Sequence, residues 1–160
     1  MSKTRRTWRQ KLEEEHPEHG KVVDIPPKMQ SRFGTGKMLI PKPLDIDALI
    51  KKVTKGQLAT VTQIRGKLAN VAHAHCSCPM TTGIFLRIVA EVAEEDFSNG
   101  QREVTPYWRV IKADGSLNEK FPGGVQVQAA RLKEEGHIIE PNRGKKPPRV
   151  KNFEKSLQEL

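Results

Sequence analysis

The sequence predicts a mainly α-helical fold with a small β wing, in the order typical of a winged helix-turn-helix domain. Two helix starts lie close together, one at Thr60 with Gln63 three residues later and one at Pro79. A β-prone run, Arg109-Val110-Ile111, then precedes the turn signal Asp114-Gly115. Adjacent helices followed by a strand and a tight turn indicate this class. We expect an extended N-terminal arm before the domain and a basic C-terminal tail after it.

Length and charge limit the classes of protein to consider. The 160 residues suffice for about one core of ordinary size, which argues against a multi-domain enzyme. The formal net charge is +9, and Lys/Arg against Asp/Glu number ten to six in residues 1–45, twelve to eleven in 46–140 and six to two in 141–160. A balanced middle with basic ends favours a polyanionic partner, nucleic acid before a membrane surface.

Residues 1–43 are expected to form a basic arm with one short helix. The helical pattern runs from Thr7 to Glu15, and the prolines and glycines that follow favour an extended chain. Gly34-Thr35-Gly36-Lys37 does not fit a phosphate-binding loop, because its first glycine is misplaced and Met38 follows the lysine.

Residues 44–140 are expected to form the ordered domain. Its first helix carries apolar residues within Ile46–Ile50, has Asp45 as N-cap and ends by Lys55-Gly56. The second helix starts at the Thr60 capping box, which predicts a firm helix start. Its expected buried residues are Val61, Ile64 and Leu68.

The helix that starts at Pro79 has apolar residues at four-residue spacing, which predicts one buried face. The expected buried residues are Met80, Ile84, Ile88 and Val92, with Phe85, Val89 and Ala93 beside them. The expected opposite face carries Thr81, Thr82, Gly83, Arg87, Glu91 and Glu94. Only the N-terminal half of that face suits a phosphate backbone, through backbone amides and hydroxyls at a helix start. Two ordinary packed helices are the alternative interpretation.

The last part of the domain contains one more helix and a closing strand. The loop Phe121-Pro122-Gly123-Gly124 leads into a helix from Val125 to Glu135, with Gly136 as its C′ residue. His137–Ile139 is expected to form the strand. Residues 141–160 then read as a basic tail, which a solvated linker explains equally well.

Several of these segments occur in an order that matches a known domain. The matching residues are Pro106, Arg109 and Val110 for a Pro-Cys-His-Arg-Val strand, then Asp114-Gly115, Phe121–Gly124 for an aromatic-x-Gly-Gly loop, and Leu132–Gly136 for a Leu-x-x-Glu-Gly ending. The run from Gly56 to Ile139 thus resembles the C-terminal domain of the alkylguanine-DNA alkyltransferases (methylated-DNA–protein-cysteine methyltransferases) and of the related alkyltransferase-like proteins. The resemblance covers roughly half the chain and implies a winged-helix DNA-binding domain.

The resemblance implies the alkyltransferase-like branch, which binds alkylated guanine without repairing it. Tyr107 stands where the family has its acceptor cysteine, and Trp108 where it has the activating histidine. A phenol, whose ordinary pKa is about 10, is a poor nucleophile when no base lies beside it. We therefore expect no catalytic residue. Tyr107, Trp108 and Glu135 are the lesion-pocket candidates, by stacking on a base or, alternatively, by packing in the core.

Two further positions depart from the family. Its tyrosine in the first helix aligns with Val61, and its intercalating arginine falls near Thr81 or Thr82, so base flipping is not supported. Arg87 lies one turn later on the helix. The residues predicted to bind DNA are Thr60, Thr81, Thr82, Gly83, Arg87, Arg109, Gly123 and Gly124.

A cluster of histidines and cysteines, His73-Ala74-His75-Cys76-Ser77-Cys78, lies before the third helix. Structural zinc sites space their ligand pairs apart, so we predict no metal here. One residue between Cys76 and Cys78 is too few for an easy disulfide, so both are expected to be thiols. Cys78 at a helix start could also be a relocated alkyl acceptor.

These observations predict a non-catalytic DNA-binding protein of the alkyltransferase-like type that recognises O6-alkylguanine or distorted DNA for repair. The expected partners are double-stranded DNA and repair proteins, with no cofactor, no membrane and a monomeric state. The N-terminus has no apolar signal-peptide core, so a cytoplasmic, bacterial protein is expected. The alternatives are a divergent DNA alkyltransferase that uses Cys76 or Cys78, and a general DNA-binding or regulatory protein without lesion preference.

Overall fold

The computed structural model describes residues 5–160, so the expectation of an arm at residues 1–4 lies outside the described residues. Helices supply most of the regular structure: α1 (Trp8–Glu13), α2 (Gln30–Phe33), α3 (Pro43–Lys51), α4 (Val61–Val71), α5 (Pro79–Ser98) and α6 (Gly124–Glu134), with 3₁₀ helices η1 (Pro27–Met29), η2 (Tyr107–Arg109) and η3 (Phe153–Ser156). The strands are short: β1 (Val22–Asp24), β2 (Lys37–Leu39), β3 (Ala59–Thr60), β4 (Cys76–Ser77), β5 (Val110–Ile111), β6 (Ile139–Glu140) and β7 (Arg149–Val150). The fold is therefore helix-rich with small sheets.

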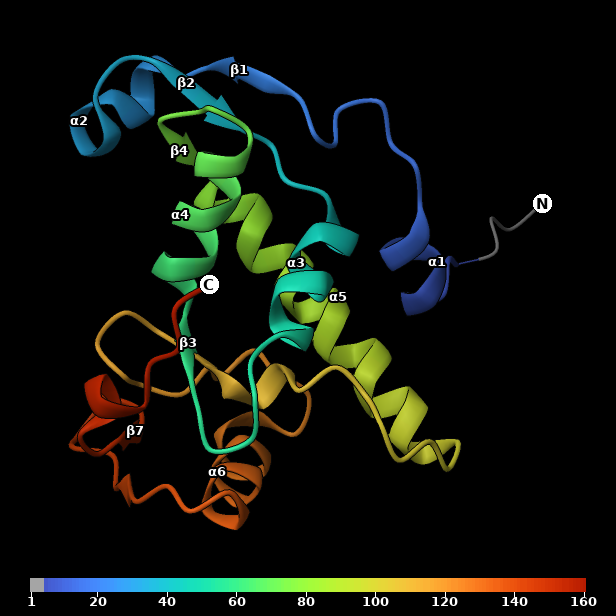
Figure 1. Cartoon of the computed structure of the whole chain (residues 1–160), viewed down its shortest axis with the longest axis vertical. Helices are drawn as coiled ribbons and strands as arrows, with labels where there is room; N and C mark the ends of the chain where they lie inside the picture. Colours follow the sequence, from blue (N-terminus) through green and yellow to red (C-terminus); the bar gives the residue numbers. More distant parts are fainter. Residues whose placement is uncertain (1–4) are drawn as a thin grey trace.

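Helix α5 runs through the middle of the molecule, and α1 and α3 pack against it (Figure 1). Its buried residues are Thr82, Phe85, Leu86, Ile88, Val89, Ala90, Val92 and Ala93. Each large apolar side chain buried here stabilises the fold by roughly 1.5–3 kcal/mol relative to exposure. The core lies on both sides of this one helix. Among residues 5–160, no helix has the length and apolarity that crossing a membrane requires.

The predicted helix starts at Thr60 and Pro79 are confirmed. Thr60 Oγ1 accepts from the Gln63 backbone N–H at 3.1 Å, and Gln63 Oε1 accepts from the Thr60 backbone N–H at 2.8 Å. Pro79 is the first residue of α5. The predicted N-cap Asp45 is wrong, because Pro43 starts α3 two residues earlier and Asp45 lies in its first turn.

The expected extended arm is wrong for the described part of residues 1–43. Strand β1 pairs antiparallel with β2, which pairs parallel with β4 in the turn between α4 and α5 (Figure 1). Leu12 of α1 and Leu39 of β2 are both buried in the main core. Apolar residues therefore anchor this segment in the core, and the turn between α4 and α5 is held by a sheet.

The β wing forms only in part. Strand β5 pairs parallel with β3, and after the Asp114-Gly115 turn Ser116 forms an antiparallel bridge with Arg149 instead of a second strand beside β5. The buried Gln128 of α6 fixes this region, because its side-chain amide donates to the carbonyls of Trp108 and Val110 at 3.1 and 2.9 Å. The predicted C′ residue Gly136 has a φ of +94°, as a left-handed helix end requires.

Residues 141–160, predicted as a basic tail, are part of the fold, so the alternative of a solvated linker is wrong. Strand β7 pairs antiparallel with β6, and Val150 and Phe153 are buried in the core. Farther on, the Leu58 backbone N–H donates to the Ser156 carbonyl at 2.8 Å, and Gln158 N–H donates to the Leu58 carbonyl at 2.9 Å. The apolar residues between the lysines bring this segment back beside β3 (Figure 1).

Candidate nucleic-acid interface

The N-terminal half of α5 exposes two apolar side chains that the sequence pattern placed in the core. Met80 is 70% exposed and Ile84 55%, whereas Thr82, predicted on the open face, is fully buried. An α-helix advances about 100° per residue, so a four-residue spacing drifts by about 40° at each step. Three steps separate Met80 from Val92, and the accumulated rotation of about 120° turns Met80 away from the core.

A groove lies beside this exposed half of α5. It has a volume of about 540 Å³, within the range of about 300–1,000 Å³ that is usual for ligand sites. The N-terminal part of α4, the first two turns of α5 and the loop after β5 form its walls. Its lining residues are Val61, Thr62, Arg65, Pro79, Met80, Gly83, Ile84, Leu86, Arg87, Lys112, Ala113, Asn118, Glu119 and Lys120.

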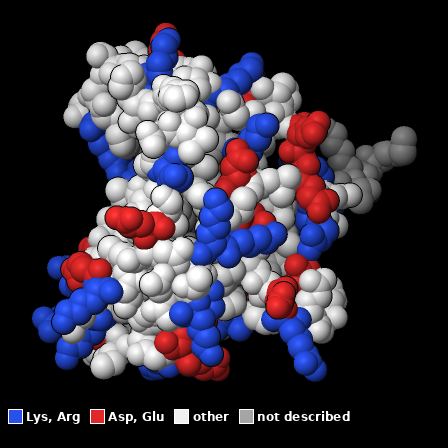
Figure 2. All heavy atoms as spheres, viewed as in Figure 1, with Lys and Arg blue, Asp and Glu red and all other residues white. Residues whose placement is uncertain are grey.

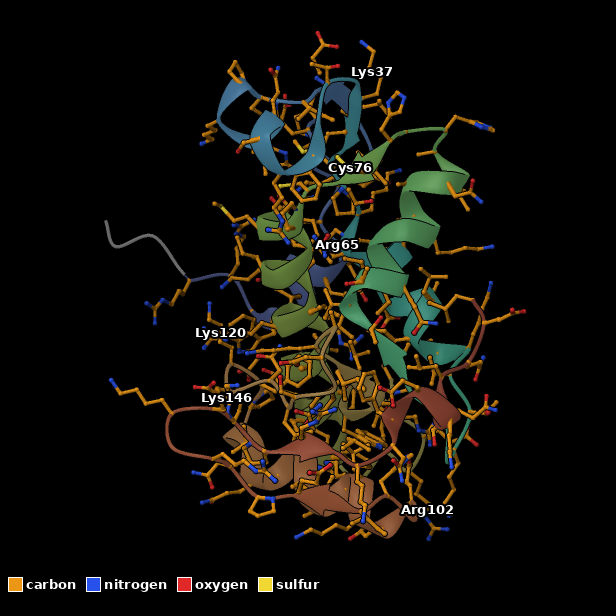
Figure 3. The ribbon with its side chains drawn as sticks, turned by 90° about the vertical axis from the view of Figure 1, so that its left-hand side faces the viewer. Lys37, Arg65, Cys76, Arg102, Lys120 and Lys146 are labelled. Atoms are coloured by element: carbon orange, nitrogen blue, oxygen red, sulfur yellow. The ribbon has the colours of Figure 1, made fainter. Side chains whose placement is uncertain are left out.

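Cations dominate the charge of the groove. Arg65, Arg87, Lys112 and Lys120 line it against the single carboxylate of Glu119. Within the described part of the chain, Arg87 forms an ion pair with Glu91 at 3.8 Å and lies over the Trp8 ring, and the other three cations form no ion pair. Figure 3 shows Arg65 and Lys120 on one side of the molecule, whereas basic and acidic side chains intermingle on the face in Figure 2. The groove therefore favours an anionic ligand.

Arg65 is the most constrained of these cations. Burial, together with the nearby Arg32 guanidinium, lowers the pKa of Arg65, which nevertheless stays protonated because an arginine side chain keeps its charge in proteins. Its Nε is buried and has no hydrogen-bond partner among the described residues.

The side chains of the three threonines predicted to bind DNA form hydrogen bonds within the protein instead. The Thr60 side chain caps α4, and the buried Thr82 hydroxyl donates to the Cys78 carbonyl at 2.7 Å. The Thr81 hydroxyl, which is half-buried, donates to Cys78 Sγ at 3.2 Å. These three hydroxyls therefore stabilise the starts of α4 and α5, and they do not line the groove.

The predicted glycines divide into two groups. Gly83 lines the groove and has no atom of a neighbouring element within 4 Å of an added Cβ, so helix packing gives no reason for it. Gly123 and Gly124 instead shape the start of α6 with φ values of +78° and +68°. An added Cβ at Gly123 would lie 2.2 Å from Val127 Cγ2, so this glycine is required by the turn.

The Arg109, Trp108 and Glu135 side chains form one buried hydrogen-bonded group. Arg109 donates to both oxygens of Glu135, each at 2.8 Å, and to the Val53 carbonyl at 2.6 Å. Trp108 Nε1 donates to Glu135 Oε2 at 3.1 Å. Burial opposes ionisation of Glu135, but these hydrogen bonds hold its pKa below the ordinary value. Arg109 was predicted to bind DNA, and here its guanidinium neutralises an internal carboxylate.

Tyr107 is fully buried, and its hydroxyl forms a hydrogen bond inside the protein. Its hydroxyl donates to Glu94 Oε1 at 2.5 Å, and Arg131 donates to the same oxygen at 2.7 Å. Its ring packs edge-to-face against Trp108 and Phe121. Burial and the adjacent Glu94 carboxylate raise the pKa of Tyr107 far above its ordinary value. The phenol is therefore held neutral, and its ring has no free face for a base.

The lesion-pocket candidates and the groove open to different surfaces. Trp108 and Arg109 line a polar depression of about 920 Å³ that also includes Lys51, Phe97 and Arg102. This depression shares no lining residue with the groove at the start of α5. The structure thus brings Tyr107, Trp108 and Glu135 together, but it does not bring them to the predicted DNA-binding helix face.

The cysteine and histidine cluster does not assemble into one site. Burial and the neighbouring Cys78 raise the pKa of the Cys76 thiol. Cys78 is 8% exposed and contacts the Thr81 hydroxyl. His75 Nδ1 accepts from the Lys37 backbone N–H at 2.8 Å, which uses that nitrogen in the fold. Among the described residues, no three His, Cys, Asp or Glu side chains are placed to hold one metal ion.

Of the residues predicted to bind DNA, Gly83 and Arg87 line the groove, and three of its cations were missed. Arg65, Lys112 and Lys120 come from α4 and from the loop that follows β5, so only the fold brings them together. The available signal was the lysine on each side of the Asp114-Gly115 turn, because lysine side chains are common phosphate contacts in nucleic-acid-binding proteins.

Comparison with known proteins found similarity to solved structures. No family model matches it, and no curated protein matches it. A crystal structure of S. pombe Atl1 in complex with damaged DNA containing O6-carboxymethylguanine has a TM-score of 0.49 at 17% identity, over 74% of this chain and 94% of that one. A crystal structure of S. pombe ATL in complex with DNA has a TM-score of 0.48 at 17% identity, with the same coverage. Likeness of this degree leaves the family of the chain open.

Proposed function

We propose that this chain binds duplex DNA through the groove beside the N-terminal half of α5, as a non-catalytic protein of the alkyltransferase-like type. The observation that carries the proposal is the set of four cations around the groove, three of which form no ion pair among the described residues. The first turn of α5 borders the groove through Pro79 and Met80 and contains no carboxylate, so no acidic side chain offsets the positive end of the helix dipole there. Duplex DNA supplies the regularly spaced phosphates that such a surface fits.

The chemistry around Tyr107 supports a role without catalysis. Its hydroxyl is buried, neutral and bonded to Glu94, so no phenolate is present to attack an alkyl group. The cysteine alternative lacks an activated thiolate at Cys76, because burial raises the pKa of that thiol. A binding protein fits these side chains better than an alkyl acceptor.

Recognition of O6-alkylguanine or distorted DNA is the finer part of the proposal. It is supported by the family-like order of the motifs from Pro106 to Gly136 and by a groove large enough for a ligand. A general DNA-binding protein without lesion preference is the second candidate. The observation that favours it is the separation of the groove from the buried Tyr107 and Trp108.

Fluorescence anisotropy with two matched duplexes tests the proposal. One duplex is unmodified, the other carries a single O6-methylguanine, and both are titrated at the same salt concentration and again over a salt series. We expect binding to both, weakening as salt rises, with the lesion duplex bound more tightly. Equal affinities would leave the general DNA-binding protein, and no binding to either duplex at low salt would refute the whole proposal.

Mass spectrometry of the protein after incubation with the lesion duplex tests the absence of catalysis. We expect an unchanged mass. A gain of one methyl group would contradict the proposal, and Cys76→Ser and Cys78→Ser variants would then identify the acceptor. Trypsin fragments of the modified protein would give the same answer independently.

A further inference from the structure

Residues 20–44, which we call the N-terminal sheet segment, contribute nothing to the groove, yet their charge resembles that of its walls. The segment contains five lysines and arginines and a single carboxylate, Asp24. The stretch 48–90, which supplies α4 and the first half of α5, contains no carboxylate. By contrast, residues 91–140 contain ten. The segment and the walls of the groove therefore share a composition that is poor in acidic side chains.

A short sheet holds this segment beside the groove. Strand β2 pairs parallel with β4, and Leu39 lies opposite Ser77. The Ser77 hydroxyl in turn donates to the Arg65 carbonyl at 2.8 Å, which joins β4 to α4 at a residue that lines the groove. In Figure 3, Lys37, Arg65 and Lys120 follow one another down the long axis of the molecule. The segment therefore continues the groove side of the molecule along that axis.

Apolar contacts fix the position of the segment. Ile25 and Met38 are buried and form a small core with Cys78, the N-cap of α5. Phe33 of α2 packs against the same core. Burying large apolar side chains stabilises such an arrangement by roughly 1.5–3 kcal/mol for each one that is fully buried. The helices η1 and α2 are therefore held on the body of the protein, and their polar side chains have defined places on its surface.

Two cations of η1 and α2 have no acidic partner. Lys28 and Arg32 are exposed, and neither forms an ion pair within residues 5–160. The Arg32 guanidinium lies over the Phe33 ring, 4.8 Å from the ring centroid, which orients it. It is also near enough to Arg65 to contribute to the lowered pKa of that residue. The cations of the segment therefore adjoin those of the groove and form one positive surface with them.

We propose that the N-terminal sheet segment is a second contact surface for the bound duplex, where Lys28 and Arg32 contact phosphates beyond those at the groove. The inference rests on the proposed DNA binding, and it adds a surface from outside the family-like run of residues 56–139. Duplex DNA carries one negative charge for about every 1.7 Å of its axis, so a duplex laid along the molecule presents phosphates to both surfaces. The segment lengthens the stretch of DNA that one protein covers and adds affinity without reading the sequence.

The salt dependence of binding tests the second surface, measured by fluorescence anisotropy on an unmodified duplex of about 20 base pairs, roughly two helical turns. The double variant Lys28→Ala/Arg32→Ala should lower the slope of log affinity against log salt by about 1.8, because each lost phosphate contact removes about 0.9. The variant Lys28→Arg/Arg32→Lys keeps both charges and should keep the wild-type slope. A loss of slope in this charge-preserving variant would assign the effect to altered packing and overturn the proposal.

The matched control is Lys133→Ala/Lys151→Ala, which removes two positive charges from exposed side chains elsewhere. These lysines belong to α6 and to the turn after β7, at the end of the molecule away from α2 (Figure 1). The control should keep the wild-type slope, and an equal loss in both double variants would overturn the second surface. It would also be overturned, with the groove left standing, if Arg87→Ala lowered the slope and Lys28→Ala/Arg32→Ala did not. No binding by the wild type at low salt would overturn both proposals.

Discussion

The N-terminal half of α5 differs from its C-terminal half in what its side chains contact. In the first half, Met80, Ile84 and Arg87 are exposed beside an open groove. In the second half, Glu94 accepts hydrogen bonds from Tyr107 and Arg131, and Phe97 stacks on Trp108. A single helix of about 30 Å thus carries a binding surface at one end and a structural polar network at the other. Substitutions at the two ends should therefore separate affinity from stability.

The largest expected effect is at Glu135, the C-cap of α6, which bonds to Trp108 beside the C-terminal half of α5. Glu135→Ala leaves the Arg109 guanidinium, whose side chain is 13% exposed, without its carboxylate. We expect a loss of about 3–5 kcal/mol in the free energy of unfolding, measured by urea denaturation. Glu134→Ala, at an exposed neighbouring position, is the control and should change stability by less than about 0.5 kcal/mol. If the two variants were equally stable, this network would not hold the fold together.

A smaller loss is expected from Tyr107→Phe, which removes one hydroxyl and keeps the ring. Glu94 would keep Arg131 but lose the 2.5 Å hydrogen bond from Tyr107. We expect a loss of about 0.5–1.5 kcal/mol in urea denaturation and no change in DNA affinity. A large change in affinity at constant stability would place Tyr107 in the binding site and contradict the separation of the two ends.

At the binding end, the cations should affect affinity with little effect on stability. Arg87→Ala and Lys120→Ala are each expected to reduce the slope of log affinity against log salt by about 0.9, the value for one lost phosphate contact. Stability should change by less than about 0.5 kcal/mol. Lys55→Ala, an exposed lysine outside the groove, should leave the slope unchanged. If Arg87→Ala and Lys120→Ala kept the same salt dependence of affinity as Lys55→Ala, the groove would not be part of the DNA interface.

The smallest expected effect is a dependence of stability on pH from His137. Burial, with Arg109 nearby, lowers the pKa of His137, so the folded state keeps the imidazole neutral. The unfolded chain takes up a proton near the ordinary pKa of about 6.5, so stability is present above that pH and falls as pH drops below it. Burial likewise lowers the pKa of His19, which adds to the same change.

Urea denaturation at pH 7.5 and pH 5.5 measures this change. The wild type should be less stable at pH 5.5, and His137→Gln should reduce the difference. His73→Gln, at an exposed position, serves as the control. An equal difference in the wild type and in His137→Gln would show that His137 does not contribute.

Local sequence signals predicted where the helices begin. Which segments pair into sheets depends on contacts between residues far apart in the sequence. The Thr60 capping box and Pro79 act within one turn of a helix, so the sequence contains all of the interaction. Strands of two or three residues carry no such signal. The pairing of β2 with β4 therefore had to come from tertiary contacts, and the N-terminal segment that looked extended is part of a sheet.

The site was predicted in part for the same reason. Gly83 and Arg87 follow from the position of α5 alone, whereas Arg65 and Lys120 join them only when α4 and the loop after β5 are in place. The lesion-pocket candidates were inferred from motif order, which places residues along the chain but not relative to the groove. The exposure of Met80 was missed because a four-residue spacing was treated as one full helical turn.

The C-terminal segment packs beside β3, so during synthesis the backbone around Leu58 waits for partners from the end of the chain. Leu58 forms a bridge with Leu157, and the Thr54 backbone N–H donates to the Gln158 side chain, 104 residues farther along the chain. At about 5–20 residues per second, translation delivers these partners roughly 5–20 s after Leu58. Once α5 has been synthesised, about 60 residues remain before Leu157 is reached, and until then the backbone at Leu58 lacks its partner strand. Such an unpaired strand edge is the kind of surface that other chains can pair with.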